Sequence, residues 1–366
     1  MPRTAKKVKL GIIGCVGIAN GKHMPSLSKV PEVEMAAFCD IIEDRTVKAA
    51  AEYGVKGAKV YKDYKELLAD ASIDVVHVLT PNSSHSPITV DALNAGKHVM
   101  CEKPMAKNYA EAKLMLDTAK KVGKKLTIGY QNRFSKENQH LNRLCRAGEL
   151  GDIYYAKSHA TRRRAVPTWG VFLNEEEQGG GPLIDIGTHA LDLTLWMMNN
   201  YEPAMVVGSV YRKLADRKNS ANAWGPWDPK KFTVEDSAFG MIKMKNGATI
   251  WLESSWALNT LHVDEAKTIL CGTEGGADMQ GEDGGLRING EKYSRMYVTK
   301  PDLNAGGVAF YAGSSASAAD VEARMWIDHI LDDKKPLLTK PEQAIVVTQL
   351  LDAVYASAKS GQPVML

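Results

Sequence analysis

The 366-residue sequence has no long apolar run, little net charge and no paired cysteine motif, and each absence excludes a class of protein. No run is long enough to span a membrane, and the apolar run after the basic N-terminus MPRTAKK is too short and glycine-broken for a signal peptide. The formal net charge is +3 and the basic residues are scattered, which argues against nucleic acid as a partner. The five cysteines form no CxxC pair, so we expect free thiols and a cytoplasmic location.

Strand-like apolar runs do occur, and up to about residue 130 they alternate with amphipathic segments. The expected strands are residues 8–13, 34–39, 74–79, 97–101 and 125–130, and helices are expected between them, for example over 44–54 and 86–96. This alternation predicts an α/β domain with a parallel sheet and helices on both faces.

The pattern changes after about residue 150. Runs such as SAFGMIKM and GATIWLESSWAL, with a hairpin signal at Asn246-Gly247, predict a largely antiparallel second domain. We therefore expect a first domain over 1–130 and a second domain over 131–340. A C-terminal helical segment over 341–366 is expected to pack back between them.

The stretch GIIGCVGIAN (11–20) resembles the glycine-rich turn that binds the pyrophosphate of a dinucleotide. Its three marker positions hold Gly14, Val16 and Ala19, so a β-branched valine replaces the second glycine. Valine there is expected to weaken cofactor binding unless Gly17 supplies the missing space. A helix N-terminus after the turn would still attract phosphate.

Asp40 ends the second predicted strand, 26 residues after Gly14. A carboxylate there can accept hydrogen bonds from a ribose diol and repels a 2'-phosphate, which favours NAD over NADP. The alternative is that Asp40 only caps the next helix. Two further polar segments, TPNSSH (80–85) and EKP (102–104), also follow strands, where ligands of open α/β sheets bind.

Together these motifs resemble the Gfo/Idh/MocA family, named after glucose-fructose oxidoreductase and inositol dehydrogenase. The resemblance rests on GIIGCVGIA, Asp40, TPNSSH, CEKP, GYQNRF (129–134) and GGGPLIDIGTHALDL (179–193), and it covers essentially the whole chain. It implies a Rossmann domain over 1–130 that binds the dinucleotide. It also implies an α+β domain over 131–340 for substrate binding and oligomerisation, with a large open sheet whose free face forms a homo-oligomer. The cofactor-binding residues that follow from these motifs are Gly14, Val16, Gly17, Ile18, Ala19, Asp40, Thr80, Asn82, His85, Glu102, Lys103, Gln131 and Arg133.

Lys103 is expected to be catalytic. Pro104 keeps Lys103 out of the helical region, and the resemblance adds that their peptide bond is often cis. The amine could then hold the substrate hydroxyl and stabilise negative charge on its oxygen, while Glu102 lies toward the nicotinamide. The alternative is an ordinary surface lysine.

Asp185, His189 and Asp192 are spaced by four and three residues, which places them on one face of a helix. A carboxylate beside an imidazole raises its basicity, so Asp185 and His189 form a plausible dyad for removing a hydroxyl proton. The alternatives are a helix-dipole role for Asp185 with a buried structural His189, or a divalent-metal site. Because no other obvious metal ligands accompany them, we expect no metal.

The segments ATRRRAVPTWGVF (160–172) and AWGPWDP (223–229) are aromatic loops suited to a sugar face or an aromatic aglycone. Arg164 and Trp169 are the expected substrate contacts, whereas Trp224 and Trp227 could equally fill an interface. Together with the 179–193 motif, this segment resembles the branch of the family that oxidises the glucosyl 3-hydroxyl of C- or O-glycosides.

We therefore predict NAD-dependent oxidation of a secondary hydroxyl of a sugar or glycoside to a keto sugar. The alternatives are an inositol or free-aldose dehydrogenase, an NAD-dependent glycosidase and a non-catalytic dinucleotide-binding regulator. The expected partners are a small-molecule substrate and further copies of the chain, not nucleic acid or a membrane.

Overall fold

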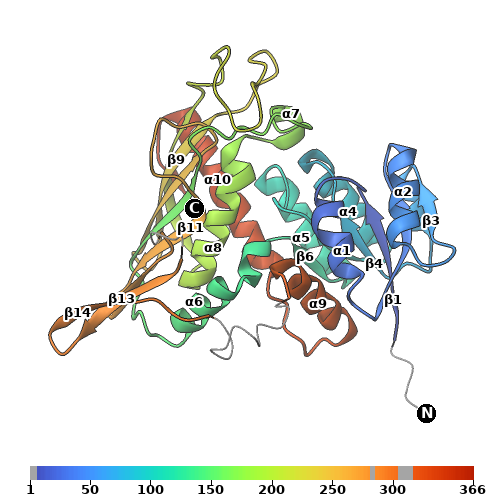
Figure 1. The fold of residues 1–366 in the computed structure, drawn as a ribbon, viewed down its shortest axis with the longest axis horizontal. Coiled ribbons are helices and arrows are strands. Elements are labelled where there is room, and N and C mark those ends of the chain that lie inside the picture. Colours follow the sequence, from blue (N-terminus) through green and yellow to red (C-terminus); the bar gives the residue numbers. More distant parts are fainter. Residues whose placement is uncertain (1–5, 281–284, 304–315) are drawn as a thin grey trace. The chain divides into compact units, whose positions relative to one another are not determined.

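The computed structural model describes residues 6–280, 285–303 and 316–366, and it divides into two compact units (Figure 1). The N-terminal unit comprises Met1–Phe134 and Ala316–Ile345, and the C-terminal unit comprises Ser135–Ser315 and Val346–Leu366. The segment 316–340, which the sequence analysis assigned to the second domain, therefore belongs to the first unit. Helix α10 (Pro341–Ser360) begins in one unit and ends in the other.

The N-terminal unit contains a parallel sheet of six strands within its described residues, in the order β3-β2-β1-β4-β5-β6. Its strands are β1 (Val8–Ile13), β2 (Val33–Cys39), β3 (Lys59–Tyr61), β4 (Val75–Val78), β5 (His98–Cys101) and β6 (Leu126–Ile128). This order is that of a Rossmann fold, as expected. Strands β2 and β3 are added on one side of β1, whereas β4, β5 and β6 are added on its other side, so the order of addition changes side between β1 and β4. The carboxyl ends of β1 and β4 therefore mark the point where such sheets bind their ligands.

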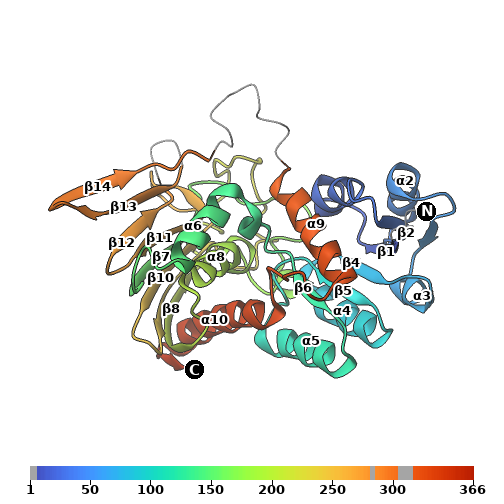
Figure 2. The same cartoon turned by 90° about the horizontal axis from the view of Figure 1, so that it is seen from below.

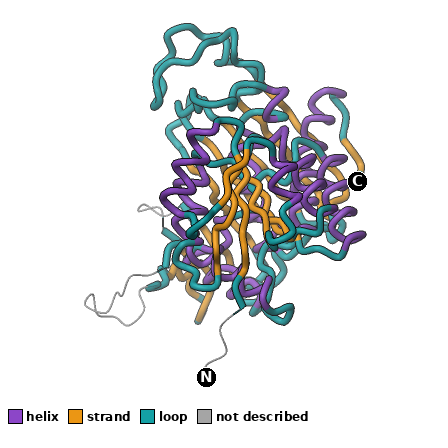
Figure 3. The backbone as a smooth tube through the Cα atoms, turned by 90° about the vertical axis from the view of Figure 1, so that its right-hand side faces the viewer, coloured by secondary structure: helices purple, strands orange, loops and turns teal. Residues whose placement is uncertain are grey.

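Helices lie on both sides of this sheet (Figure 3). They are α1 (Met24–Leu27), α2 (Glu43–Tyr53), α3 (Tyr64–Ala69), α4 (His85–Asn94), α5 (Tyr109–Val122) and α9 (Ala318–Leu331), with short turns η1 (Ala19–His23), η2 (Asn82–Ser84) and η3 (Gln131–Phe134). Helix α9 starts at a capping box formed by Ser317 and Asp320. Its Trp326 and Ile327 are buried in the same core as Leu10 of β1, so a segment late in the chain completes the first unit.

The C-terminal unit contains a nine-stranded sheet among its described residues, in the order β14-β13-β12-β11-β7-β10-β9-β8-β15. Its strands are β7 (Tyr155–Thr161), β8 (Pro203–Tyr211), β9 (Ser237–Met244), β10 (Thr249–Ser255), β11 (Asp264–Cys271), β12 (Gly275–Asp278), β13 (Arg287–Lys292), β14 (Arg295–Thr299) and β15 (Val364–Met365). The described pairs are antiparallel except β7 with β10, which confirms the mainly antiparallel prediction. The Asn246-Gly247 turn joins β9 to β10, with Gly247 at φ 92°.

Helices α6 (Lys136–Arg146), α8 (Thr188–Met198) and the C-terminal part of α10 lie on one face of this sheet (Figure 2). Two short elements, α7 (Glu175–Gln178) and η4 (Leu183–Gly187), precede α8. In β10, Leu252 is buried whereas Trp251, on the opposite face, is exposed. In the part of the chain that the structure describes, no helix is long and apolar enough to cross a bilayer.

Candidate functional site

The glycine turn between β1 and η1 is shaped by two left-handed residues. Gly14 has φ 91°, and a Cβ there would lie 2.5 Å from the carbonyl oxygen of Leu79, so no larger residue fits. The second positive φ, 55°, falls on Gly17 and not on Val16, and no atom lies within 4 Å of a Cβ built on Gly17. The open space beside Gly17 suits the close approach of a pyrophosphate, so the residues present fit a dinucleotide despite Val16.

The side chain of Asp40 stabilises this glycine turn by hydrogen bonding. Its Oδ2 accepts the backbone N–H of Cys15 at 3.0 Å, and its Oδ1 accepts that of Ile42 at 3.0 Å. Arg45 lies 3.5 Å from Oδ1. Since the N-cap residue of α2 is Ile42, Asp40 is more than a helix cap: it links the end of β2 to the cofactor turn. The expected contact of Asp40 with a ribose stays a prediction.

The EKP segment has the backbone that the family resemblance implies, because the Lys103-Pro104 peptide bond is cis. Lys103 is half-buried, and its backbone N–H donates to Oε2 of Glu102 at 2.9 Å. The carboxylate of Glu102 is itself buried and lies 2.9 Å from the Lys22 ammonium and 2.8 Å from Nε2 of His23. Glu102 thus holds the Lys103 backbone, and its expected position toward the nicotinamide stays a prediction.

The buried charges around Glu102 extend to Glu322 of α9, which lies 2.7 Å from the Lys22 ammonium. Burial alone would raise the pKa of Glu102, but Lys22 and His23 hold it well below its usual range. Burial lowers the pKa of His23 and of His77, whose Nδ1 atoms are 3.3 Å apart. Sequence analysis missed Lys22, His23 and Glu322. The available signal was the adjacent polar pair Lys22 and His23, just after the glycine turn.

Two predicted cofactor-binding residues, His85 and Arg133, have hydrogen-bond partners within the fold. His85 is buried, with Nδ1 2.8 Å from the carbonyl of Pro104 and Nε2 2.9 Å from that of Thr80. Its ring therefore ties the EKP segment to the TPNSSH segment. Arg133 has no exposed surface, and its Nη1 donates to the Leu338 carbonyl at 3.0 Å and to Gln343 at 2.7 Å. A guanidinium enclosed in this way anchors the segment after α9, and the expected role of Arg133 in cofactor binding stays a prediction.

The other predicted cofactor positions lie around the same end of the sheet. Ala19 and Asn82 are buried, Thr80 and Gln131 are half-buried, and Ile18 is exposed. A fully buried Ala19 fits the third marker position of the glycine turn, where a small residue allows helix and sheet to pack closely.

In the C-terminal unit, Asp185 lies on the π-helical turn η4, which runs directly into α8 with His189. Asp185 and His189 are both half-buried, whereas the residues next to each of them are buried. Asp192 is buried, whereas Asp185 and His189 are partly accessible. The π-helical winding of η4 changes the angular spacing from that of an α-helix, and such turns are frequent at functional sites.

An aromatic cluster holds Asp185 and continues to the surface of the same unit. The indole of the fully buried Trp256 donates to Oδ2 of Asp185 at 3.0 Å. Phe172 packs on Trp256 and on Trp169, with ring centroids 6.5 and 5.8 Å apart, and Trp169 meets Trp224 edge to face at 4.8 Å. Trp169 and Trp224 are 51% and 44% exposed, which makes them a surface available to a ligand.

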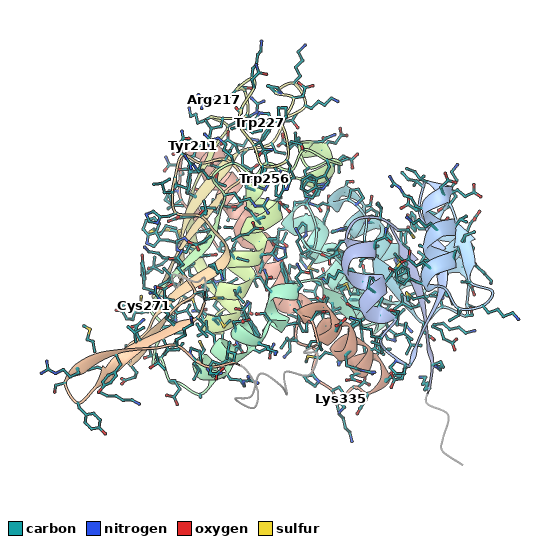
Figure 4. All side chains as sticks on the ribbon, in the orientation of Figure 1. Tyr211, Arg217, Trp227, Trp256, Cys271 and Lys335 are labelled. Carbon is teal, nitrogen blue, oxygen red and sulfur yellow. The ribbon has the colours of Figure 1, made fainter. Side chains whose placement is uncertain are left out.

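Trp227 and two arginines of these loops have partners in the fold. Trp227 is buried near Trp256 (Figure 4), and its indole donates to the Ala215 carbonyl at 2.9 Å, so it is structural. Arg164 donates to Oδ1 of Asn259 at 2.5 Å, and Arg162 forms a two-point ion pair with Glu265 at 2.6 Å. Among the described residues, no group of three or more histidines, cysteines or carboxylates is arranged to hold a metal ion.

Comparison with known proteins agrees with this architecture. Residues 8–130 match the family model described as an oxidoreductase family with an NAD-binding Rossmann fold, and residues 143–366 match its C-terminal alpha/beta domain. D-glucoside 3-dehydrogenase of Escherichia coli (strain K12) is 36% identical over 363 residues, 99% of each chain. Glucose-6-phosphate 3-dehydrogenase of Bacillus subtilis (strain 168) is 32% identical over 65% of each chain.

Solved structures show the same fold. The aldose-aldose oxidoreductase from Caulobacter crescentus, complexed with glycerol, superposes with a TM-score of 0.78 at 24% identity and covers 99% of this chain and 100% of its own. A levoglucosan dehydrogenase in complex with NADH and levoglucosan gives a TM-score of 0.80 at 20% identity, covering 98% and 99%. The family models, the full-length relative and the order of the motifs agree, and the chain is an oxidoreductase of the Gfo/Idh/MocA family, a family of sugar dehydrogenases.

Proposed function

We propose that this oxidoreductase uses NAD to oxidise the 3-hydroxyl of a glucosyl group in a C- or O-glycoside, giving the 3-keto glycoside. The observation that carries the proposal is the pair Asp185 and His189, two half-buried polar residues on an otherwise buried segment. The chain that holds them is 36% identical to a D-glucoside 3-dehydrogenase. The exposed pair Trp169 and Trp224, linked to Asp185 through Phe172 and Trp256, supports a substrate with an apolar sugar face or an aryl group.

The residues of the N-terminal unit support NAD as the cofactor. Gly14 and Gly17 form a turn with room for a pyrophosphate, and Asp40 places a negative charge beside that turn, where it disfavours a 2'-phosphate. When bound, the nicotinamide supplies the acceptor for the hydrogen that leaves the substrate carbon as hydride.

The chain's own residues handle the proton and the charge on oxygen. In the proposal, His189 takes the proton of the substrate hydroxyl, and Asp185 orients the ring and stabilises the imidazolium that forms. The Lys103 ammonium donates a hydrogen bond to the same oxygen, which stabilises negative charge there as the C–H bond breaks. The substrate thus loses one proton and one hydride, and a C–O double bond forms.

The test is to mix the purified protein with NAD and, separately, an aryl glucoside, glucose and myo-inositol, and to follow absorbance of the reduced nicotinamide. We expect a rise with the glucoside, with a product lighter by two hydrogens in mass spectrometry. A rise only with inositol or glucose would identify a free-polyol enzyme, for which an inositol 2-dehydrogenase 30% identical over 52% of this chain is a precedent.

The His189→Ala variant separates catalysis from binding. Loss of the general base should lower kcat on the order of a hundredfold or more, with dinucleotide binding retained. Free aglycone released by the protein alone would instead favour an NAD-dependent glycosidase. No turnover with any substrate, together with intact dinucleotide binding, would favour a non-catalytic regulator.

A further inference from the structure

A buried carboxylate, Glu235, lies just before β9 and has no role in the chemistry proposed above. Its Oε2 accepts the backbone N–H of Gly181 at 2.7 Å, and its Oε1 accepts that of Leu183 at 3.1 Å. The hydroxyl of Tyr355, from α10, donates to the same Oε1 at 2.9 Å. Three donors from two segments of the C-terminal unit therefore converge on one carboxylate with only 7% of its surface exposed.

The two backbone donors belong to the start of the helix that carries Asp185 and His189. The N-cap position of η4 is Pro182, which has no side-chain hydrogen bond to offer the first turn. Initial N–H groups of a helix need an acceptor, and a negative charge there is also favoured by the helix dipole. Glu235 supplies both the acceptor and the negative charge, although it follows Leu183 by 52 positions in the sequence.

The glycines of the GGGP sequence make this contact possible. A Cβ on Gly180 would lie 2.0 Å from the Tyr355 hydroxyl oxygen, and a Cβ on Gly181 would lie 2.3 Å from the backbone oxygen of Glu235. Neither glycine has a positive φ, so close approach, not backbone conformation, is the reason for glycine at these two positions. The carbonyl of Pro182 is held separately by the Ser254 hydroxyl at 2.7 Å.

We propose that Glu235 and Tyr355 are positioning residues that clamp the Gly181–Leu183 turn and so set the placement of Asp185 and His189. The proposal rests on the proposed function for the role of those two residues. The clamp acts through the helix backbone: the turn fixed by Glu235 lies two residues before Asp185, whose own side chain is fixed by Trp256.

The charge state of Glu235 gives the clamp a measurable signature. Burial raises its pKa to about 7, even though the hydrogen bonds from Gly181, Leu183 and Tyr355 each lower it. Tyr355 remains a donor, since burial and the charge of Glu235, with Glu175 and Asp352, raise its pKa well above the usual value. Removing the Tyr355 hydroxyl should therefore move the pKa of Glu235 upward.

The experiment measures kcat and KM against pH for the full-length wild type and for Tyr355→Phe, Glu235→Gln and Asp236→Asn. Asp236 is the matched control, because it is a buried neighbouring carboxylate whose Oδ2 accepts the backbone N–H groups of Leu214 and Ala215 instead of the η4 turn. Hydrogen exchange of the peptide covering residues 179–190 is measured on the same proteins.

We expect the acidic limb of kcat to move to higher pH in Tyr355→Phe, and kcat to fall about tenfold or more in Glu235→Gln with a smaller change in KM. Exchange in 179–190 should be faster in both variants, whereas Asp236→Asn should leave the limb and this exchange unchanged. The proposal is overturned if the wild type is active but neither Tyr355→Phe nor Glu235→Gln changes the acidic limb of the pH profile, kcat or the hydrogen exchange of residues 179–190. If the wild type shows no dehydrogenase activity, the proposed function fails, and the exchange of 179–190 in Glu235→Gln still decides whether the clamp exists.

Discussion

The indole N–H of Trp256 and the carboxylate of Asp185 form a hydrogen bond of 3.0 Å, from a tryptophan with no exposed surface. Phe172 and Phe232 pack on the same indole, with ring centroids 6.5 and 6.4 Å away. A rigid donor of this kind restricts the rotamer of Asp185. The orientation of the proposed dyad therefore depends on the aromatic core behind it.

The Trp256→Phe variant tests this dependence. It removes the donor to Asp185 and leaves a void, so we expect a stability loss on the order of 2 kcal/mol and a kcat lowered about tenfold. Trp227→Phe is the matched control, since Trp227 is also buried but donates to the Ala215 carbonyl. Steady-state kinetics and denaturant unfolding of both variants provide the measurement. Equal losses of kcat in the two variants would contradict the role of the Trp256 hydrogen bond.

The glycine turn predicts an asymmetry between its two central residues. Val16→Gly should change dinucleotide affinity little, because the left-handed residue and the open space are both at Gly17. Gly17→Ala should weaken binding, since an alanine at φ 55° costs about 1 kcal/mol and its methyl enters the space for the phosphates. Fluorescence titration with NADH gives both dissociation constants. A gain of tenfold or more in Val16→Gly would show that the valine obstructs the site.

The position of Asp40 predicts the choice of cofactor. Asp40→Asn removes the negative charge beside the turn, so kcat/KM with NAD should fall about tenfold while kcat/KM with NADP rises. Asp74→Asn is the control, because Asp74 also accepts a backbone N–H, that of Lys9 at 2.9 Å, but lies at the start of β4 away from the turn. An unchanged ratio of the two cofactors in Asp40→Asn would refute the assignment.

The ion pairs of Lys22 predict a large effect on stability. Lys22→Met leaves Glu102 and Glu322 buried without their shared cation, which should cost about 3–5 kcal/mol of unfolding free energy. The pair of Lys59 with Asp70 has a similar length, 2.8 Å, but the lysine side chain is 60% exposed. Lys59→Met should therefore have little measurable effect, because solvent screens that pair. Chemical denaturation compares the two variants, and comparable losses would mean that burial does not strengthen the Lys22 pairs.

The raised pKa of Glu235 predicts a pH dependence of stability. A folded pKa of about 7, above the usual 4.5, means that the folded protein holds a proton that the unfolded chain has released between these values. The contribution of Glu235 to stability is therefore complete below pH 4.5 and is lost as pH rises through 7, by roughly 3 kcal/mol. In Glu235→Gln this loss should be absent. Unfolding free energies of both proteins at pH 5 and 8 measure the difference, which should be zero if Glu235 titrates normally.

The elements with a regular spacing of apolar residues could be predicted from the sequence. The parallel strands β1, β2, β4, β5 and β6 and the hairpin at Asn246-Gly247 were predicted from local apolar patterns. Strand β3 was missed because it has only three residues and none is buried, and β14 because all of its residues are exposed. Where apolar alternation is absent, local pattern cannot distinguish a strand from a loop.

The candidate site was predictable where one short motif holds it and not where distant segments meet. Gly14, Lys103, Asp185 and His189 stand in local motifs. In contrast, Lys22 meets Glu102 and Glu322 across 80 and 300 residues, and Glu235 meets Gly181 across 54. Arg133 and His85 stand in family motifs, yet their partners are carbonyls that no single sequence can identify.

The return of α9 to the core of β1 also bears on how the protein is made. During synthesis, the N-terminal unit is incomplete until the chain extends beyond α9. Only then are Trp326 and Ile327 available for its core, and Glu322 available to pair with Lys22. Most of the C-terminal unit precedes α9 in sequence and leaves the ribosome before the first unit can be completed. The two units therefore cannot fold one after the other during synthesis from the N-terminus. A fragment ending at residue 134 would leave part of its apolar core uncovered, and such exposed apolar surface is what chaperones bind.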